Sequence, residues 1–324
     1  MTATLPSALI LAAGLGTRLR PLTTSRAKPS IPVAGTPLIR RIIRALVAQG
    51  VREVVVNLHH RPESIAGVLG DGDGLGCRLR YSWEPVVLGS AGGPRHALPL
   101  LGERFLVVNG DTWCDVALGP LLETHRERGA AVTLAGAVHP TPERYGGLLT
   151  DGDGWVRGVT RAGDTRPAWH FVGIQVAEAR VFAPLEDGVP TASIGDLYDR
   201  LWDRPGRIAL HEVGAAFLDI GTPADYLAAS HAIGAVEDAP DTQVGLRCVV
   251  DPSARLDRSI LWDDVVVGPG CVIRECILAD RVRVPGGSRY ERQAVVPWSP
   301  EAAGTPGATR QGDLLTASLD GGRP

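Results

Sequence analysis

The first 235 residues alternate between two spacings of apolar side chains, one typical of buried strands and the other typical of helices. Apolar runs predict strands at 7–13, 51–58, 77–83, 103–111 and 130–138. Helical spacing lies between them, in the runs PLIRRIIRALVAQG, PESIAGVLG and ALGPLLETHRERG. This alternation predicts an α/β fold: a Rossmann-like, mixed but mostly parallel sheet with helices on both faces. Ligands of such sheets bind at the carboxyl ends of the strands.

The pattern changes after residue 235. The polar stretch 235–248 is predicted to be a linker, and from residue 249 short apolar pairs recur between Asp, Gly and Pro. This rhythm is typical of hexapeptide repeats, so residues 249–297 are predicted to form a short left-handed parallel β-helix of about two coils. Residues 298–324 are predicted to be a flexible tail. The expected organisation is an α/β domain at 1–234, followed by linker, β-helix and tail.

Composition narrows the classes of protein that fit. With a net charge of -3 and a pI near 6.2, the chain lacks the excess of basic residues typical of nucleic-acid-binding proteins, so no nucleic-acid partner is expected. No apolar run reaches the ~18–20 residues of a membrane span, and no basic segment precedes the first apolar run. We therefore predict neither a membrane span nor a signal peptide. The five cysteines contain no CxxC pair and fit reduced thiols in a cytoplasmic protein.

Lys28 is the one lysine among the 33 basic residues of the chain. Arginine is a rigid planar fork, whereas lysine is a compact point charge on a flexible stem. A chain that uses arginine wherever charge alone is needed is expected to keep lysine where a guanidinium does not fit. The alternative is a lysine left by chance on the surface, and the neighbouring sequence decides between the two.

That neighbouring sequence is a glycine loop directly after the first predicted strand. In LAAGLGTRLRPLT, Gly14 and Gly16 allow a tight turn whose backbone N–H groups can point at phosphate oxygens. Arg18 stands where a guanidinium can hold the outer phosphates of a nucleotide. A GxG after a strand is weak evidence by itself. Here, however, the loop continues as GxGTRLxPLT and is followed by Lys28 and Pro29.

This long motif resembles that of the sugar-1-phosphate nucleotidylyltransferases, also called NDP-sugar pyrophosphorylases. The resemblance continues through LGSAGG (88–93), VVNGDT (107–112), RYGGL (144–148), FVGIQV (171–176) and FLDIGTPADYL (217–227). It covers about residues 7–233, and the chain is similar to mannose-1-phosphate guanylyltransferases and N-acetylmuramate-1-phosphate uridylyltransferases. The implied reaction, catalysed by residues 1–234, is attack by a sugar 1-phosphate oxygen on the α-phosphorus of a nucleoside triphosphate, with pyrophosphate leaving.

The same resemblance implies roles for individual residues. Arg18 and Lys28 are implied to be catalytic, and the compact ammonium of Lys28 would follow the charge that moves across the reacting phosphorus. Asp111 and Asp219 each end a predicted strand and are implied to bind Mg²⁺ together with phosphate oxygens, with Asp115 as an alternative ligand. The residues implied to bind the nucleotide are Leu11, Ala12, Ala13, Gly14, Gly16, Thr17, Arg18, Glu84, Gly89, Ser90, Asn109 and Gly110. Those implied to bind the sugar phosphate are Tyr145, Gly146, Arg161 and Gly173.

Glu84 favours GTP as the nucleotide. A carboxylate can accept hydrogen bonds from both the N1–H and the exocyclic amine of guanine, whereas uracil and thymine offer one such donor. We expect mannose 1-phosphate as the sugar substrate, with UTP and dTTP as alternatives to GTP. On the sugar side, many family members carry Glu-Lys-Pro after the hairpin predicted at 145–159, but this chain reads VTRAGDTRP. Arg161 or Arg166 is expected to replace the missing lysine.

Two other functions fit part of the pattern. A non-catalytic paralogue that senses NDP-sugar would keep the fold, but it would not need the complete set of phosphate-binding and metal-binding residues. A glycosyltransferase would place a DxD motif after a strand, and NGDTWCD is not DxD. The β-helix segment has no histidine between 249 and 290 to act as the base of an acyltransferase. We therefore expect it to serve regulation or the assembly of a homo-oligomer.

Overall fold

The computed structural model describes residues 5–202, 204, 207–214 and 217–320. The chain divides into two compact units. The first unit comprises Met1–Gly14, Arg41–Pro62 and Leu69–Leu218, and the second comprises Leu15–Arg40, Glu63–Val68 and Asp219–Pro324. This division differs from the expected boundary at residue 234, because the segment after the first strand groups with the C-terminal third of the chain.

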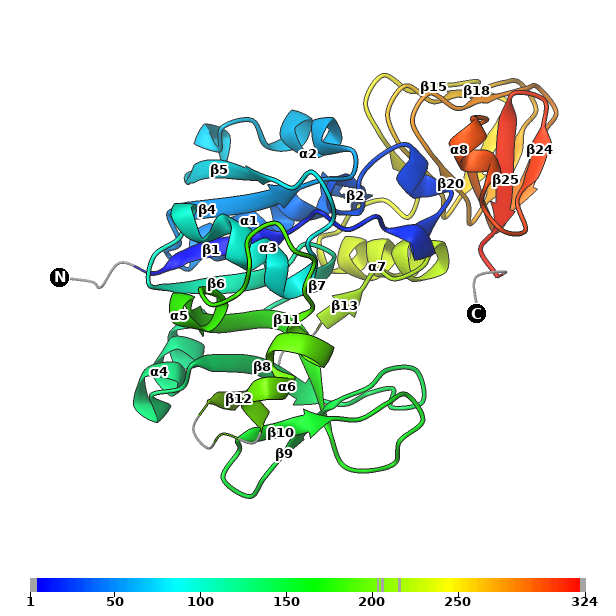
Figure 1. Cartoon of the computed structure of the whole chain (residues 1–324). Helices are drawn as coiled ribbons and strands as arrows, with labels where there is room; N and C mark the ends of the chain where they lie inside the picture. The colour runs from blue at the N-terminus through cyan, green and yellow to red at the C-terminus, as the bar shows by residue number, and fades with distance from the viewer. Residues whose placement is uncertain (1–4, 203, 205–206, 215–216, 321–324) are drawn as a thin grey trace. The chain divides into compact units, whose positions relative to one another are not determined.

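The first unit is built on a nine-stranded sheet in the order β10-β9-β11-β6-β1-β4-β5, with β8 paired to β11 and to β12 (Figure 1). Its strands are β1 (Ser7–Leu11), β4 (Glu53–Leu58), β5 (Arg78–Trp83), β6 (Arg104–Asn109), β8 (Val132–Val138), β9 (Leu148–Thr150), β10 (Val156–Val159), β11 (Trp169–Glu178) and β12 (Ile208–Glu212). Neighbours among β6, β1, β4 and β5 are parallel, as are β8 and β12, whereas β11 runs antiparallel to β6 and β8. The predicted mixed α/β sheet is confirmed.

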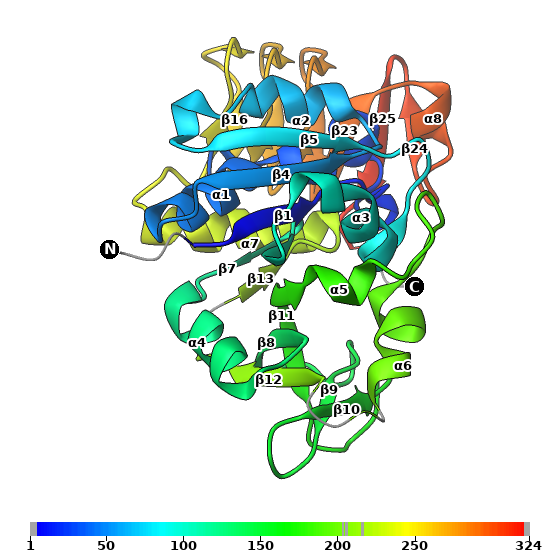
Figure 2. The same ribbon diagram turned by 60° about the vertical axis from the view of Figure 1, so that its left-hand side comes forward.

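Helices cover this sheet. They are α3 (Gly89–Ala97), α4 (Leu118–Arg128), α5 (Ala179–Phe182), α6 (Asp199–Trp202), most of α1 (Leu38–Ala48) and the short turns η4 (Asp73–Leu75), η5 (Leu98–Leu100) and η6 (Ser193–Leu197). A separate pair of short strands is formed by β7 (Thr112–Cys114) and β13 (Phe217–Asp219). Helix α3 packs against β1 and β4, and α4 packs against β8 and β12 (Figure 2).

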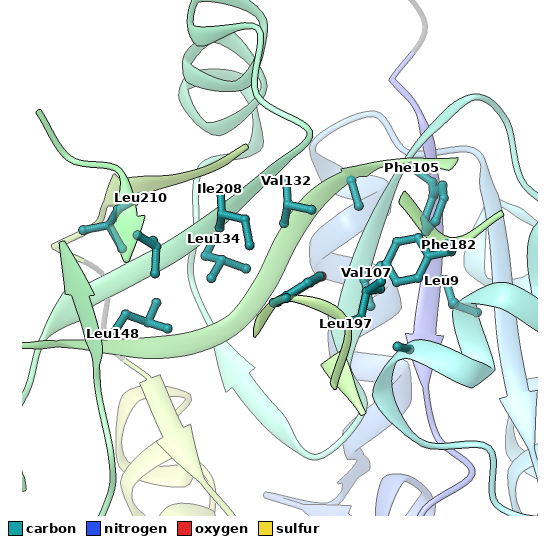
Figure 3. Packing of buried hydrophobic residues seen from close by; sticks show 14 of the residues in the cluster. Leu9, Phe105, Val107, Val132, Leu134, Leu148, Phe182, Leu197, Ile208 and Leu210 are labelled. Atoms are coloured by element: carbon teal, nitrogen blue, oxygen red, sulfur yellow. The ribbon is translucent and has the colours of Figure 1, made fainter. Parts of the chain in front are cut away.

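The core of the first unit explains why its strands read as continuous apolar runs. One cluster of buried side chains extends from Leu210 and Leu134 at one end to Phe105 and Phe182 at the other (Figure 3). The rings of Phe105 and Phe182 lie 5.8 Å apart. Burying one such side chain contributes about 1.5–3 kcal/mol, so this cluster fixes the sheet whose strand ends carry the predicted site.

The N-terminal part of the second unit consists of short elements that pack on a helix. The short elements are η1 (Thr17–Leu19), η2 (Leu22–Thr24), η3 (Lys28–Ser30), β2 (Pro32–Val33), β3 (Thr36–Pro37) and residues Glu63–Val68 of α2 (Pro62–Leu69). The helix is α7 (Pro223–Val236). Helix α7 begins with a capping box, in which the Thr222 hydroxyl accepts from the Asp225 N–H and the Asp225 carboxylate accepts from the Thr222 N–H. The Ala34 N–H donates to the Ser230 hydroxyl over 2.8 Å, which ties the β2–β3 hairpin to α7.

The rest of the second unit is a parallel β-helix, visible in Figure 1 as coils lying side by side. Its strands are β14 (Gln243–Val244), β15 (Val249–Val250), β16 (Arg255–Asp257), β17 (Ile260–Leu261), β18 (Val266–Val267), β19 (Val272–Arg274), β20 (Ile277–Leu278), β21 (Arg283–Val284), β22 (Arg289–Glu291) and β23 (Gln293–Pro297). Successive coils pair at a spacing of 17 residues, as between Gln243 and Ile260. The helix therefore begins inside the predicted linker, and its three-stranded sheets show more than the two coils expected.

Residues 298–324 were expected to be a flexible tail, and for the described part of this segment that prediction is wrong. It forms α8 (Pro300–Ala303), β24 (Thr309–Gln311) and β25 (Leu314–Ser318). Strand β25 pairs antiparallel with β23. The Leu314 side chain joins the buried core of the β-helix, so the segment covers apolar surface that the last coil would otherwise expose. No helix within the described ranges is long and apolar enough to cross a membrane.

Candidate functional site

Several predicted site residues of the first unit gather at one edge of its sheet. Because β1, β4, β5 and β6 are parallel neighbours, their carboxyl ends lie at the same edge. Ala12 follows β1, Glu84 follows β5, and Gly110 and Asp111 follow β6. The Gly110 N–H donates to the Leu11 carbonyl over 2.9 Å, which joins the ends of β1 and β6.

A buried polar network supports this edge. The side-chain oxygen Oδ1 of Asn57, near the end of β4, accepts from the backbone N–H groups of Ala12 and Ala13. The Asn57 amide donates to Glu84 Oε1 over 2.6 Å, and the Leu88 N–H donates to Glu84 Oε2 over 2.9 Å. Asn57 and Glu84 therefore link the start of the glycine loop to the segment that precedes α3.

The placement of Glu84 differs from the prediction that it binds guanine. The residue is 0% exposed, and both carboxylate oxygens accept hydrogen bonds from the chain itself. A carboxylate held in this way supports the loops around it and has no exposed surface for a base. The sequence did not reveal this role, because nothing in it indicated that Asn57 lies against Glu84.

Gly93, the last residue of the LGSAGG motif, makes room for the same network. A Cβ atom at position 93 would lie 2.8 Å from Glu84 Oε1 and 2.9 Å from Asn57 Nδ2, closer than real Cβ contacts. Gly89 and Ser90, both predicted to bind the nucleotide, stand at the beginning of α3. The Ser90 hydroxyl accepts from the Ser193 N–H over 2.8 Å, so this end of the helix is tied to η6.

Asp111 and Asn109 flank Gly110 at the end of β6. Asp111 is half-buried, and the Thr112 hydroxyl donates to Asp111 Oδ1 over 3.3 Å. Asn109 lies against Gly173, at the point where the pairing of β11 with β8 shifts register. The structure thus places Gly173 beside a predicted nucleotide-binding residue.

The predicted sugar side lies on the hairpin of β9 and β10. Thr160 and Gly147 are joined by hydrogen bonds in both directions: the Gly147 N–H donates to the Thr160 hydroxyl, and the Thr160 N–H donates to the Gly147 carbonyl, each over 2.7 Å. Gly146 therefore lies against the backbone of Thr160 and Arg161. The Tyr145 ring meets the edge of His170, with 5.7 Å between centroids.

The two candidate replacements for the family lysine differ in their surroundings. Arg166 donates to both oxygens of Asp164, and this guanidinium lowers the pKa of the Asp164 carboxyl to about 2. The Arg161 side chain is exposed and makes no hydrogen bond or ion pair with any residue that the structure describes, whereas its backbone carbonyl accepts from the Asp164 N–H over 3.1 Å. Arg161 is therefore the better placed of the two to receive an anion.

In the second unit, the glycine loop and the lysine pack directly against each other. A Cβ atom at Gly16 would lie 2.8 Å from Thr23 Cγ2 and 3.4 Å from Lys28 Cβ, and Gly16 has a φ of 61°. The Thr23 hydroxyl donates to the Gly16 carbonyl over 3.0 Å. Lys28 begins η3 and is 6% exposed, whereas Thr17 and Arg18 are exposed. The one lysine of the chain is therefore buried beside the loop.

Arg18 and Asp219 lie close together in the same unit. A Cβ atom at Gly221 would lie 3.2 Å from Asp219 Oδ2 and 3.4 Å from Arg18 Nη1, so both charged groups flank that glycine. No group of three or more His, Cys, Asp or Glu side chains suited to a metal ion occurs among the described residues. One or two carboxylates nevertheless suit Mg²⁺, which completes its shell with phosphate oxygens and water. Asp219 and Asp111 belong to different units, so their pairing at one ion stays a prediction.

Comparisons with known proteins agree with these motifs. The family described as "Nucleotidyl transferase" matches residues 7–235. A mannose-1-phosphate guanylyltransferase of Mycobacterium tuberculosis is 29% identical over 295 residues, which cover 82% of each chain. A UTP–glucose-1-phosphate uridylyltransferase of Synechocystis is 27% identical and covers 87% of this chain and 77% of that one.

A catalytic subunit beta of mannose-1-phosphate guanylyltransferase from Drosophila pseudoobscura is 32% identical, over 68% of this chain and 60% of its own length. Among solved structures, that of HddC from Yersinia pseudotuberculosis superposes with a TM-score of 0.62 at 24% identity. The superposition covers 71% of this chain and 100% of the HddC chain, which confirms the fold.

Proposed function

Since this chain belongs to the nucleotidyl transferase family, we propose that it transfers a nucleoside monophosphate from a nucleoside triphosphate to a sugar 1-phosphate. The observation that carries the proposal is the buried Lys28 beside the glycine loop, inside the matched region. In the reaction, an oxygen of the sugar phosphate forms a bond to the α-phosphorus while the bond to pyrophosphate breaks. The attacking oxygen is already ionised, so the protein's task is to position two polyanions and to neutralise their charge.

The residues of the second unit suit this task. Arg18 is exposed and offers a planar fork to the outer phosphates of the triphosphate. Lys28 offers a compact charge to the reacting phosphate, where a preorganised cation stabilises the transition state. Asp111 and Asp219 would hold Mg²⁺, which supplies further charge neutralisation at the phosphate oxygens when bound.

GTP and mannose 1-phosphate remain the proposed substrates, although Glu84 no longer supports them. Their support comes from the relatives that are named as mannose-1-phosphate guanylyltransferases. The similarity to a UTP–glucose-1-phosphate uridylyltransferase favours a second candidate, UTP with glucose 1-phosphate. On the sugar side, Arg161 is the proposed anchor for the phosphate, because Arg166 is already paired with Asp164. A cytoplasmic location and a homo-oligomer are also proposed.

A substrate panel tests the proposal. Purified protein is mixed with each of four nucleoside triphosphates and several sugar 1-phosphates in the presence of Mg²⁺, and pyrophosphate release is measured. We expect release with GTP and mannose 1-phosphate to exceed release with every other pair. A preference for UTP and glucose 1-phosphate would support the second candidate. No release from any pair, together with tight NDP-sugar binding, would identify a non-catalytic sensor instead.

A further inference from the structure

Arg26 joins the segment that carries Lys28 to the β-helix. It lies two residues before Lys28, between η2 and η3. Its guanidinium donates to both carboxylate oxygens of Asp280 and to Asp263 Oδ2, each over 2.6 Å. The two acids are 17 residues apart and therefore occupy equivalent positions on successive coils.

The acids are themselves fixed to the backbone of the coils. Asp263 Oδ1 accepts from the Leu246 N–H over 2.8 Å, and Asp280 Oδ1 accepts from the Asp263 N–H over 3.0 Å. The Arg26 side chain is 13% exposed. Burial alone lowers the pKa of Arg26, but its hydrogen bonds to the Asp280 and Asp263 carboxylates, and the attraction of their charges, outweigh burial and raise the pKa above its ordinary value. The guanidinium is therefore held as a cation in one orientation.

A second connection reaches the same segment on the other side of Lys28. Trp262 is fully buried, and Arg26 Cζ lies 5.3 Å from the centroid of its ring. The Trp262 Nε1–H donates to the Tyr226 hydroxyl over 3.0 Å, and that hydroxyl donates to the Pro32 carbonyl. The β-helix thus holds the chain at residue 26 directly and at residue 32 through Tyr226.

Helix α2 holds the segment between these two points. The Ala27 N–H donates to the Ser64 hydroxyl over 3.0 Å. The Ser30 hydroxyl donates to the Ala27 carbonyl over 2.8 Å. Lys28 is therefore flanked by fixed backbone on both sides, and two of the three supports depend on residues of the β-helix.

We propose that the β-helix contributes to the transfer site: Asp263 and Asp280 hold Arg26, and Arg26 positions Lys28 for the reaction. This inference rests on the proposed role of Lys28. It assigns the β-helix a role beyond oligomerisation or regulation, the functions expected from sequence. Arg26 is a positioning residue, because it acts on the reaction through the backbone that it holds. A displacement of about 1 Å in a reacting group can lower turnover by about 100-fold.

Three variants and a matched control test the proposal by kinetics. Arg26→Gln removes the positive charge. Arg26→Lys keeps the charge but loses the planar guanidinium that binds both acids. Asp280→Asn removes the negative charge of the carboxylate that accepts two of the three hydrogen bonds from Arg26. Arg247→Gln is the control, because Arg247 makes a similar 2.6 Å pair with Asp264 on the same β-helix at an exposed corner. We expect kcat per folded molecule to fall by about tenfold or more in the three variants, with little change in KM for the triphosphate. Arg247→Gln should keep wild-type turnover.

Hydrogen exchange of the peptide 24–33 supplies a readout that does not depend on turnover. Exchange at the amides of Ala27 and Ser30 should become faster in the three variants and stay unchanged in Arg247→Gln. Wild-type kcat and wild-type exchange in folded Arg26→Lys and Asp280→Asn would overturn the proposal. A lower melting temperature with unchanged kcat per folded molecule would also overturn it, since Arg26 would then be merely structural. If the wild type releases no pyrophosphate in any pair, the proposed function fails, and exchange alone decides whether the β-helix fixes the segment.

Discussion

The side-chain amide of Asn57 donates a hydrogen bond to the carboxylate of Glu84 over 2.6 Å, and both residues are almost completely buried. The other amide atom of Asn57, its oxygen, accepts from the glycine loop at Ala12 and Ala13. Each polar atom of this pair therefore has a partner. The start of the nucleotide loop is held by this network, in which Asn57 is 27 residues from Glu84 and 45 residues from Ala12.

Glu84→Gln should destabilise the protein without changing its preference for a base. The new amide must point a donor at either the Asn57 amide or the Leu88 N–H, and Asn57 cannot turn over without losing its bonds to the glycine loop. A buried donor without a partner costs about 1–3 kcal/mol. Chemical denaturation measures this cost, with Glu53→Gln as the control because Glu53 is 41% exposed in its pair with Arg80. A tenfold change in the GTP-to-UTP ratio would instead indicate direct contact with the base.

Gly93→Ala should be more damaging than an alanine elsewhere in a helix. The new methyl group would lie 2.8 Å from Glu84 Oε1 and force the network apart. We expect a loss of about 1–3 kcal/mol in the free energy of unfolding. Gly119→Ala in α4 is the matched control, because nothing lies within 4 Å of its added Cβ, and it should stabilise the protein by about 0.5–1 kcal/mol. Equal melting temperatures for the two variants would contradict this account.

Lys28→Arg should be almost as inactive as Lys28→Ala. Lys28 is buried beside Gly16, and the larger planar guanidinium has little room there. We expect kcat/KM to fall by about 100-fold or more in both variants. Arg44→Lys, at an exposed position of α1, is the reciprocal control and should keep full turnover. If a folded Lys28→Arg enzyme retains most of its turnover, charge alone is sufficient at this site.

Asp111→Asn and Asp219→Asn should each abolish Mg²⁺-dependent turnover while the protein stays folded. Each change removes a charged oxygen ligand that faces the phosphates in the proposed site. Asp115→Asn is the comparison: Asp115 is exposed and is the alternative ligand, so this variant should keep its turnover if Asp111 and Asp219 hold the ion. Turnover as a function of Mg²⁺ concentration measures the effect. Full activity in one of the first two variants would remove that residue from the metal site.

Removal of residues 241–324 should destabilise the remaining chain. The deletion removes Trp262, Asp263 and Asp280, so Tyr226 loses a hydrogen-bond donor and Arg26 loses both carboxylates. Breaking a buried ion pair by removing one partner costs about 3–5 kcal/mol, and newly exposed apolar surface adds to this loss. Circular dichroism should show a lower melting temperature or no folded protein. A truncated chain with wild-type stability and turnover would show that the β-helix is dispensable.

The sequence predicted the parts of the fold in which neighbouring residues decide the structure. The buried strands were predicted because a sheet covered on both faces needs continuous apolar runs, such as Ala8 to Ile10 in β1. Strand β25 was missed because its apolar run is short and follows Gly312 and Asp313, although Leu314 packs into the β-helix core. The start of the β-helix was missed because Gln243 is polar and Val244 is exposed, and only their pairing with Ile260 and Leu261 defines the coil.

The site was predictable where residues are close in sequence. Gly16, Arg18 and Lys28 belong to one motif, and the structure brings Gly16 and Lys28 into contact. Asn57 and Arg26 were missed because each acts on residues far along the chain, and a single asparagine or arginine gives no local signal of a distant partner. The hydrogen bond between Glu84 and Asn57 was missed for the same reason, since the two residues are 27 positions apart.

The order in which the residues are synthesised differs from the order in which their contacts can form. Arg26 is made 237 residues before Asp263 and 254 residues before Asp280. At a synthesis rate of about 5–20 residues per second, roughly 10–50 seconds pass before these partners exist. Throughout that time the segment around Lys28 lacks two of the three supports described above. The lysine is therefore among the first residues of the site to be translated and among the last to be held in place.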